Sequence, residues 1–370
     1  MRRSYLLVMT AALIAACNNE ADMAEASLTP PERGDAPAAD AIVFDVTDGT
    51  GSTRANGEIA TADVLKTGLY ASRGFGVFAC YTGKLKYEST SVSPDFMHNQ
   101  QVVYKGSAWT YDPVKYWSNN STDHVSFFAY APYEANPQDD GRCIIDMSKR
   151  DDQGDPWLNY RLAADPWSTT QPQVDLLYGV NEATGSPWLD QQRSGYGSGA
   201  KLAFSFRHAL ACIGDKMTIT MTSELNALVT SNNYDVTISQ VKIDYKNLTT
   251  KARLVLRSEG SANWKEIISG ELTTTRTYTK DVSITFPKDG GTDNTTAKLI
   301  SEGDGLFYIP LQVKGTEAAC ADVTISYTVY DGSETRNGTA TTRFLLDMNL
   351  EATKQGIALQ LTKDLDLLHP

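Results

Sequence analysis

The residue whose type and position most directly indicate chemistry is Cys17, which follows an apolar N-terminal segment. That segment, residues 5–16, comes after Arg2 and Arg3 and ends in Ala15-Ala16. A basic start, a short apolar run and small residues before the cut describe a secretory signal peptide that is too short to cross a bilayer as a helix. A cysteine directly after the small pair matches the bacterial lipobox, whose thiol is acylated, with palmitate among the chains. We therefore expect a lipoprotein signal peptide at residues 1–16 and a lipid anchor on Cys17.

Groups that serve catalysis or metal binding do not gather into a motif. The sequence contains no GxSxG, no HExxH and no phosphate-binding glycine loop. Carboxylate pairs such as Asp139-Asp140 fall in turn-like stretches, where solvation or turn capping is the ordinary role. The histidines are scattered, with none at ligand spacing: His98, His124, His208 and His369. We expect a non-enzymatic chain with no cofactor and no metal; a glycosidase pair from distant carboxylates is the remaining alternative.

The overall charge argues against one class of partner. The 370 residues include 45 acidic and 33 basic side chains, for a net charge of −12, and Lys and Arg form no cluster along the sequence. Nucleic acid and anionic lipid surfaces both attract basic chains, so neither is expected as a partner. With 41% hydrophobic residues, the chain is long and apolar enough for two domains with cores of their own.

Four cysteines remain after Cys17, and their pairing stays open. They are Cys80, Cys143, Cys212 and Cys320. In an oxidising envelope they can pair within halves, Cys80 with Cys143 and Cys212 with Cys320. Four buried thiols are the alternative.

Composition changes near residue 41. Residues 17–40 are polar, rich in Ala, Pro, Glu and Asp and without periodicity, which predicts a flexible tether. From there on, runs rich in Val, Ile, Thr and Tyr alternate with turn residues, which predicts an all-β sandwich or barrel-like chain. The expected strands are residues 42–46, 75–81, 125–130, 201–206, 216–221, 236–245, 252–256, 282–286, 306–313, 323–330 and 341–348.

A stretch rich in Gly and Ser near the midpoint, residues 194–199, is either a linker or a long hairpin loop. As a linker, it divides the chain into an N-terminal β-sandwich domain, residues 41–198, and a C-terminal β-sandwich domain, residues 199–370.

Aromatic residues concentrate between positions 109 and 133, with Trp109, Tyr111, Tyr116 and Trp117 at the start of the cluster. If exposed, these flat rings would stack on sugars and make glycan contacts. Alternatively, they form the core and rim of a sandwich, because aromatic residues bury large areas and favour strands.

Several stretches together carry a family resemblance. In chain order they are residues 74–79 (GFGVFA), 96–102 (FMHNQQV), 109–117 (WTYDPVKYW), 126–133 (SFFAYAPY) and 204–211 (FSFRHALA). In this order they resemble the fimbrillin-like (Mfa-like) proteins of Bacteroidota, which build type V pili, over residues 40–350. The last stretch is similar to the F-x-H-A-L segment that starts the family's second domain. The resemblance implies two tandem transthyretin-like β-sandwich domains.

The resemblance also implies a route of assembly. In that family a lipidated precursor reaches the outer membrane, an arginine-specific protease removes an N-terminal strand, and the groove left behind accepts a strand from another subunit. Here the removable strand would be Ile42 to Val46, with Ile42, Phe44 and Val46 pointing inward. A Gly/Ser/Thr loop at residues 48–53 presents Arg54-Ala55 for cleavage, as exposed loops of small residues do. Arg73 and Arg33 are the fallback sites, and a plain turn residue is the alternative for Arg54.

The donor strand implied by the resemblance lies near the C-terminus, where Ile357, Leu359 and Leu361 alternate with other residues. This tail lacks the family's usual Trp and Gly-Lys-x-Tyr-like stretch, and it can equally be the last strand of its own domain. We expect a structural or adhesive fimbrial subunit at the cell surface, whose partners are other fimbrial subunits and a surface receptor or glycan. The alternative is a surface lipoprotein that binds glycan through residues 109–117.

Overall fold

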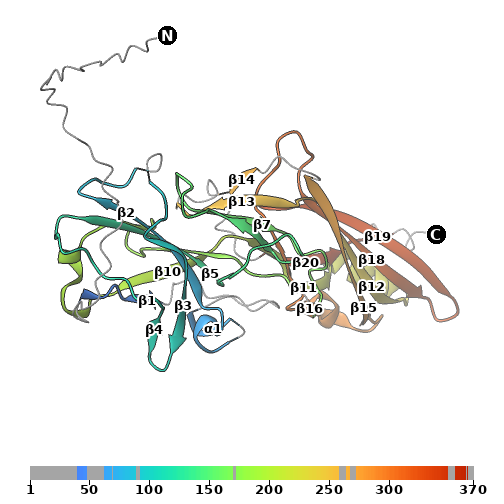
Figure 1. Cartoon of the computed structure of the whole chain (residues 1–370). Coiled ribbons are helices and arrows are strands. Elements are labelled where there is room, and N and C mark those ends of the chain that lie inside the picture. Colours follow the sequence, from blue (N-terminus) through green and yellow to red (C-terminus); the bar gives the residue numbers. More distant parts are fainter. Residues whose placement is uncertain are drawn as a thin grey trace, which may run out of the picture.

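The computed structural model describes residues 40–47, 62–68, 70–88, 92–169, 172–257, 264–266, 272–348, 355–363 and 365. These residues are mostly β, in several sheets, which confirms the expectation of a β-rich chain (Figure 1). The α-helices described are short: α1 (Ala62–Thr67) and α2 (Ser223–Ser231). None of the helices in this part of the chain has the length and apolar character needed to cross a membrane.

The largest sheet lies in the N-terminal half, which we define as the chain through His208. Its strands are, in order, β1 (Phe44–Thr47), β10 (Leu202–His208), β8 (Leu177–Val180), β5 (His124–Ala131), β2 (Phe75–Gly83), β3 (Met97–Lys105) and β4 (Ala108–Thr110), with β9 (Trp188–Gln191) paired to β5. The central strands β2 and β5 are apolar almost throughout because both faces of the sheet are covered. Phe75 and Phe127 point into a core confined to residues 42–204, whereas Phe78 and Phe128 point into a second core that spans both halves.

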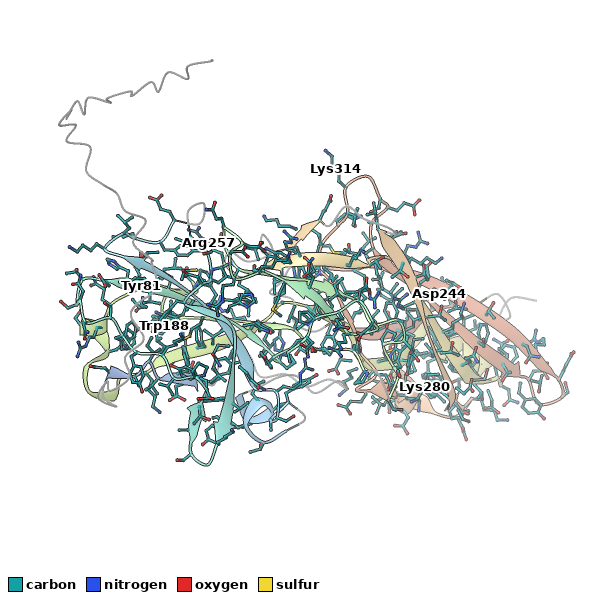
Figure 2. The ribbon with its side chains drawn as sticks, viewed as in Figure 1. Tyr81, Trp188, Asp244, Arg257, Lys280 and Lys314 are labelled. Carbon is teal, nitrogen blue, oxygen red and sulfur yellow. The ribbon has the colours of Figure 1, made fainter. Side chains whose placement is uncertain are left out.

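The C-terminal half, from Ala211 onward, contains two more sheets. One is built from β16 (Lys298–Glu302), β11 (Ala211–Met221), β17 (Leu306–Tyr308) and β20 (Gln355–Leu361). The other is built from β15 (Thr273–Phe286), β12 (Asp235–Thr249), β18 (Cys320–Tyr330) and β19 (Thr335–Leu345). Figure 2 shows the side chains of both halves, with Trp188 in the first half and Asp244 and Lys280 in the second.

A fourth sheet joins the halves, and we call it the seam sheet. Its strands are β14 (Trp264–Glu266), β13 (Lys251–Val255), β7 (Trp157–Arg161) and β6 (Ile144–Met147). Because β7 comes from the N-terminal half and β13 from the C-terminal half, their antiparallel pairing ties the halves by backbone hydrogen bonds. Trp264 reinforces the seam by donating its indole N–H to the carbonyl of Ala209 at 2.7 Å.

Residues 194–199, which the sequence offered as a linker or a long hairpin loop, do not lie between two domains. Residues 194–199 lie in a 3-10 helix, η2 (Arg193–Gly199), which connects β9 to β10. Both strands belong to the largest sheet, so this stretch connects parts of one sheet rather than two domains. The sheet of the N-terminal half therefore runs past the boundary expected between residues 198 and 199, through His208.

The four cysteines expected after Cys17 are all buried, and no disulfide joins them in the described structure: Cys80, Cys143, Cys212 and Cys320. Burial raises the pKa of the thiols of Cys80 and Cys143, which keeps both protonated and unreactive.

Candidate functional site

The candidate site is the groove that holds β1 at the edge of the largest sheet. The sequence alternates apolar and other residues here, and a strand turns such a pattern into one buried face. The structure places Ile42, Phe44 and Val46 inward, with 1%, 1% and 7% of their surface exposed. The side chains of this segment therefore pack into the core.

Aromatic rings line the centre of this groove around Phe44. Its ring lies 5.3 Å from that of Tyr111, 5.9 Å from Phe127, 6.1 Å from Phe204 and 6.3 Å from Phe75, measured between centroids. The Phe75 and Phe127 contacts are edge-to-face, the geometry that aromatic pairs prefer. We call these four rings around Phe44 the aromatic socket.

The backbone of the β1 segment is held on both sides. Residues Phe44 to Thr47 pair in parallel with Leu202 to Ser205 of β10, and Leu202 donates its N–H to Val43 at 2.8 Å. On the opposite side, Ile42 donates its N–H to Lys115 at 2.9 Å. Trp117 donates to the Asp40 carbonyl at 3.0 Å, so the strand lies in a slot rather than on an open edge.

The hydroxyl of Tyr111, one of the socket rings, also makes hydrogen bonds with backbone groups on both sides of the groove. The hydroxyl of Tyr111 donates to the Ile42 carbonyl at 2.8 Å and accepts from the N–H of Lys115 at 3.2 Å. Burial raises the pKa of Tyr111, so this hydroxyl stays protonated and available as a donor. Tyr111 therefore links β1 to the segment on its other side.

Two ion pairs flank the groove at its polar rim. Asp40 pairs with Arg193 of η2, and Asp45 accepts from Lys201 with a distance of 2.9 Å between Oδ2 and Nζ. Both cations lie partly in solvent, so each pair contributes little stability, about 0–1 kcal/mol.

The residues expected to make glycan contacts would need to be exposed, but the two tryptophans among them are buried. Trp109 is 5% exposed, packed 5.1 Å from Phe75, and Trp117 is 3% exposed, stacked 4.9 Å from Tyr196. Tyr111 is in the socket, and the half-buried Tyr116 pairs with Ala41 ahead of β1. The interpretation of exposed sugar-stacking rings is therefore wrong, because the two indoles are buried as core around β1.

The tail expected to act as a donor lies in its own half. β20 runs parallel to β11, with Ile357 opposite Met217, Leu359 opposite Ile219 and Leu361 opposite Met221. The three β20 residues are buried, as is Leu365 beyond them. The backbone of Leu361 accepts from the N–H of Thr222 at 3.0 Å, which fixes the end of the strand.

The strands β1 and β20 pair with two strands that follow one another directly in the chain, β10 and β11. β10 ends at His208 and β11 begins at Ala211, so a single run of chain passes from one half to the other. β1 lies parallel to the start of this run, and β20 lies parallel to its end. The sequence predicted both strands but did not show that they pair with two consecutive strands, β10 and β11.

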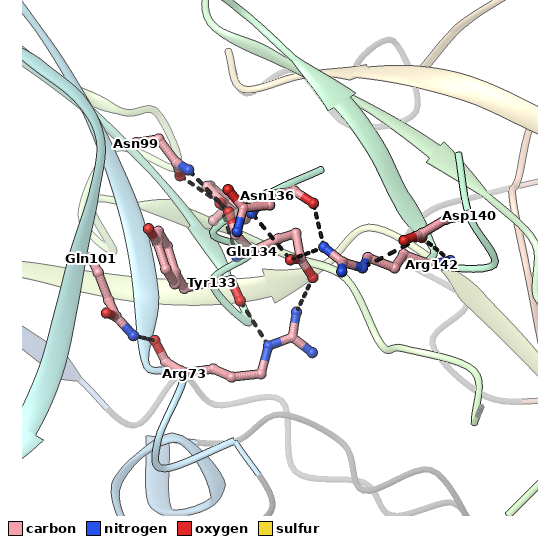
Figure 3. A network of polar contacts seen from close by, with 9 residues as sticks. Arg73, Asn99, Gln101, Tyr133, Glu134, Asn136, Asp140 and Arg142 are labelled. Atoms are coloured by element: carbon pink, nitrogen blue, oxygen red, sulfur yellow. Dashed lines mark hydrogen bonds and ion pairs between the residues drawn. The ribbon is translucent and has the colours of Figure 1, made fainter. Parts of the chain in front are cut away.

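The residues expected for lipidation and cleavage, Cys17, Arg54 and Ala55, lie outside the described residues, as does Arg33. The fallback site Arg73 is described and is engaged. Its guanidinium donates to the Tyr133 carbonyl at 2.7 Å and pairs with Glu134 at 3.3 Å (Figure 3).

Glu134 also holds a second guanidinium in the same network. Arg142 lies 3.2 Å from its Oε1 (Figure 3). Both arginines line a cavity of about 370 Å³. Gln101 donates to the Arg73 carbonyl at 3.0 Å, so side chain and backbone of Arg73 are both tied. A protease needs an extended, accessible arginine, and this geometry does not offer one.

Comparisons with known proteins agree with this architecture. A family model described as fimbrillin-like matches residues 53–344. Fimbrium subunit Fim1C of Phocaeicola vulgatus is 25% identical over 361 residues, covering 92% of this chain and 85% of that protein. The crystal structure of a fimbrial protein from Bacteroides vulgatus ATCC 8482 is similar with a TM-score of 0.60 and 21% identity, covering 87% of this chain and 94% of that one. The resemblance drawn from the sequence motifs is confirmed.

Proposed function

Because the chain belongs to the fimbrillin-like family, we propose that it is a fimbrial subunit exported as an outer-membrane lipoprotein through Cys17 and assembled by donor-strand exchange. The family is structural and not enzymatic, which confirms the expectation of a non-enzymatic chain. The observation that carries the proposal is the place of β1, a buried edge strand whose link to the rest of the fold is residues 48–61. The family resemblance further supports a transthyretin-like sandwich in each half.

Cleavage at Arg54 is the proposed trigger. β1 ends at Thr47 and α1 begins at Ala62, so a cut between them separates β1 from everything downstream. Leu65 of α1 is fully buried and holds the new N-terminal segment against the core. The lipid on Cys17 would leave together with β1, whereas an uncut chain would remain an anchored subunit.

The groove left by β1 would strongly favour a replacement strand. Burying Ile42, Phe44 and Val46 contributes at most about 5–9 kcal/mol, which departure of the strand forfeits. The departure also exposes the edge of β10 and the aromatic socket. An open edge beside an apolar groove is a template for strand addition.

β20 of another copy fits this template. Ile357, Leu359 and Leu361 repeat the i, i+2, i+4 spacing of Ile42, Phe44 and Val46, and β20 already runs parallel to its present partner. A strand given at one end and received at the other makes a head-to-tail contact that does not close, so it yields filaments.

The proposal is tested with the full-length chain and an arginine-specific protease. We expect N-terminal sequencing to find Ala55 at the start of the product and unboiled SDS gels to show a ladder of oligomers. The Arg54→Ala variant should stay uncut and monomeric, and the matched control Arg73→Ala should behave like the unaltered chain. Cleavage at Ala55 without oligomers would sink strand exchange, and a lipidated uncut chain within purified fimbriae would assign the anchor role instead.

A further inference from the structure

The outer face of the seam sheet carries basic side chains that are scattered in the sequence. Figure 1 shows β7, β13 and β14 together between the halves. Leu158, Tyr160, Ala252 and Leu254 are buried and mark the inner face of β7 and β13. The alternating residues therefore share the outer face: Arg161 of β7, Lys251 and Arg253 of β13, and, opposite Arg253, Lys265 of β14.

These cations sit directly opposite one another. Lys251 is the cross-strand neighbour of Arg161, and Arg253 is the cross-strand neighbour of Lys265. Directly opposed like charges destabilise a sheet, and here two such pairs occur in neighbouring rows. A bound anion would offset the repulsion between these opposed cations, so the face is suited to bind one.

Arg253 is fixed in place at the centre of this face. Its guanidinium carbon lies 3.6 Å from the centroid of the Trp157 ring. Its Nε donates to Asn159 Oδ1 at 3.0 Å, and Asn159 in turn donates to Asp146 at 3.3 Å. The stack and the hydrogen bond hold the guanidinium plane, which leaves the two terminal nitrogens as a preorganised fork for an oxyanion.

Counter-charges on the face are few. Asp139 pairs with Arg161, and Asp146 faces Asn159. Among the residues that the structure describes, Lys251, Arg253 and Lys265 form no ion pair. In a chain of net charge −12, this is a local positive surface.

We propose that this face binds a linear polysaccharide that carries carboxylate groups. Strand spacing places the four cations within about 12 Å of one another, a span that two or three acidic sugar units cover. The face offers charged and amide groups, and its aromatic ring, Trp157, is already stacked against Arg253. This suits a polar, anionic ligand rather than a protein with an apolar anchor. Binding at this face would not require strand exchange.

The test is affinity electrophoresis of the full chain in gels that contain polygalacturonate, with dextran as the neutral comparison. We expect retardation by polygalacturonate alone, weakened when the ionic strength rises from about 0.05 M to about 0.5 M. Arg253→Glu should raise the dissociation constant about tenfold or more, and Lys265→Glu several-fold. Arg253→Lys keeps the charge and loses the fork, so it should bind less tightly than the unaltered chain.

The matched control is Lys105→Glu, an exposed charge reversal at the end of β3, away from the seam sheet. It should leave retardation unchanged, and circular dichroism should show that every variant is folded. Equal retardation by dextran, an equal loss in Lys105→Glu, or no loss in a folded Arg253→Glu would overturn the proposal. Binding to sulfated chains alone, or equal competition by polyglutamate, would also overturn it, because the ligand would then be of another class.

Discussion

The hydroxyl of Tyr111 lies 2.8 Å from the carbonyl oxygen of Ile42, and the Tyr111 ring lies 5.3 Å from that of Phe44. One side chain thus contacts the strand through both its backbone and its central aromatic residue. The hydrogen bond can form with any strand in this position, since every residue has a carbonyl. The ring contact, in contrast, depends on which side chain occupies the position of Phe44. This division of labour suits a groove that holds one strand first and another later.

Removal of the Tyr111 hydroxyl should weaken the hold on β1 while the ring contact remains. Tyr111→Phe leaves the Ile42 carbonyl and the Lys115 N–H without this buried partner, so we expect a loss of about 1–2 kcal/mol in the free energy of unfolding. Urea denaturation of the uncut chain measures it. The control is Tyr104→Phe, whose ring packs on Trp109 and whose change should be within about 0.5 kcal/mol. Equal losses in the two variants would contradict a specific role for Tyr111.

Phe44 should matter only while β1 is in place. Phe44→Ala empties the centre of the aromatic socket, for an expected loss of about 3–5 kcal/mol in the uncut chain. After cleavage and departure of β1, the same variant should match the unaltered chain, because the substituted residue is gone. Thermal melts of the uncut and the protease-treated chains measure these two expected results. A difference that persists after cleavage would mean that β1 remains bound.

Leu359 should be needed for a subunit to donate β20 to another copy, but not for it to accept a strand in its own groove. Leu359→Asp places a charge at the centre of β20, where it opposes burial in either groove. Cut chains with this substitution should add to the end of a growing oligomer through their own empty groove but should not offer a strand onward. Titrating the variant into unaltered cut chains should therefore shorten the ladder on unboiled gels. A ladder of unchanged length would argue against β20 as the donor.

The β18–β19 turn should show a pH dependence from Asp331. Hydrogen bonds from the backbone N–H groups of Glu334 and Ser333 lower the pKa of Asp331 to about 2. Because the folded pKa lies below the unfolded value of about 3.9, this contribution to stability is present above pH 4 and is lost as the pH falls toward 2. The stability difference between the unaltered chain and Asp331→Ala should shrink over that window in acid titrations. A constant difference would mean that the carboxylate does not act through its charge.

The sequence predicted strands best where one face or both faces are buried. Ile42, Phe44 and Val46 alternate because only one side of this segment is covered, although the strand β1 itself begins at Phe44 rather than at Ile42. The apolar run from Phe75 reflects cover on both sides. β19 was expected only from residue 341, since its first residues, Thr335 to Ala340, are largely polar and partly exposed. Without a buried face, a strand leaves no hydrophobic period to detect.

The groove itself could be predicted only in part. The aromatic cluster was visible, but the sequence did not distinguish a ring that faces solvent from one that faces Phe44. That distinction depends on long-range neighbours such as Phe204, which is far from Phe44 in the chain and beside it in space. The seam sheet was missed for the same reason, because Trp157 and Val255 are paired across almost a hundred positions.

The seam sheet has a mechanical consequence. If subunits join by the proposed strand exchange, a pull along a fimbrium would enter each subunit at β10, beside β1, and leave it at β11, beside β20. Halves joined by a loose linker would extend under that tension. Here β7 and β13 are paired over five residues, so sliding one half past the other must shear several hydrogen bonds at once instead of opening them one by one. Under the proposed assembly each subunit would act as a stiff link, and the extensibility of the fimbrium would reside in the contacts between subunits.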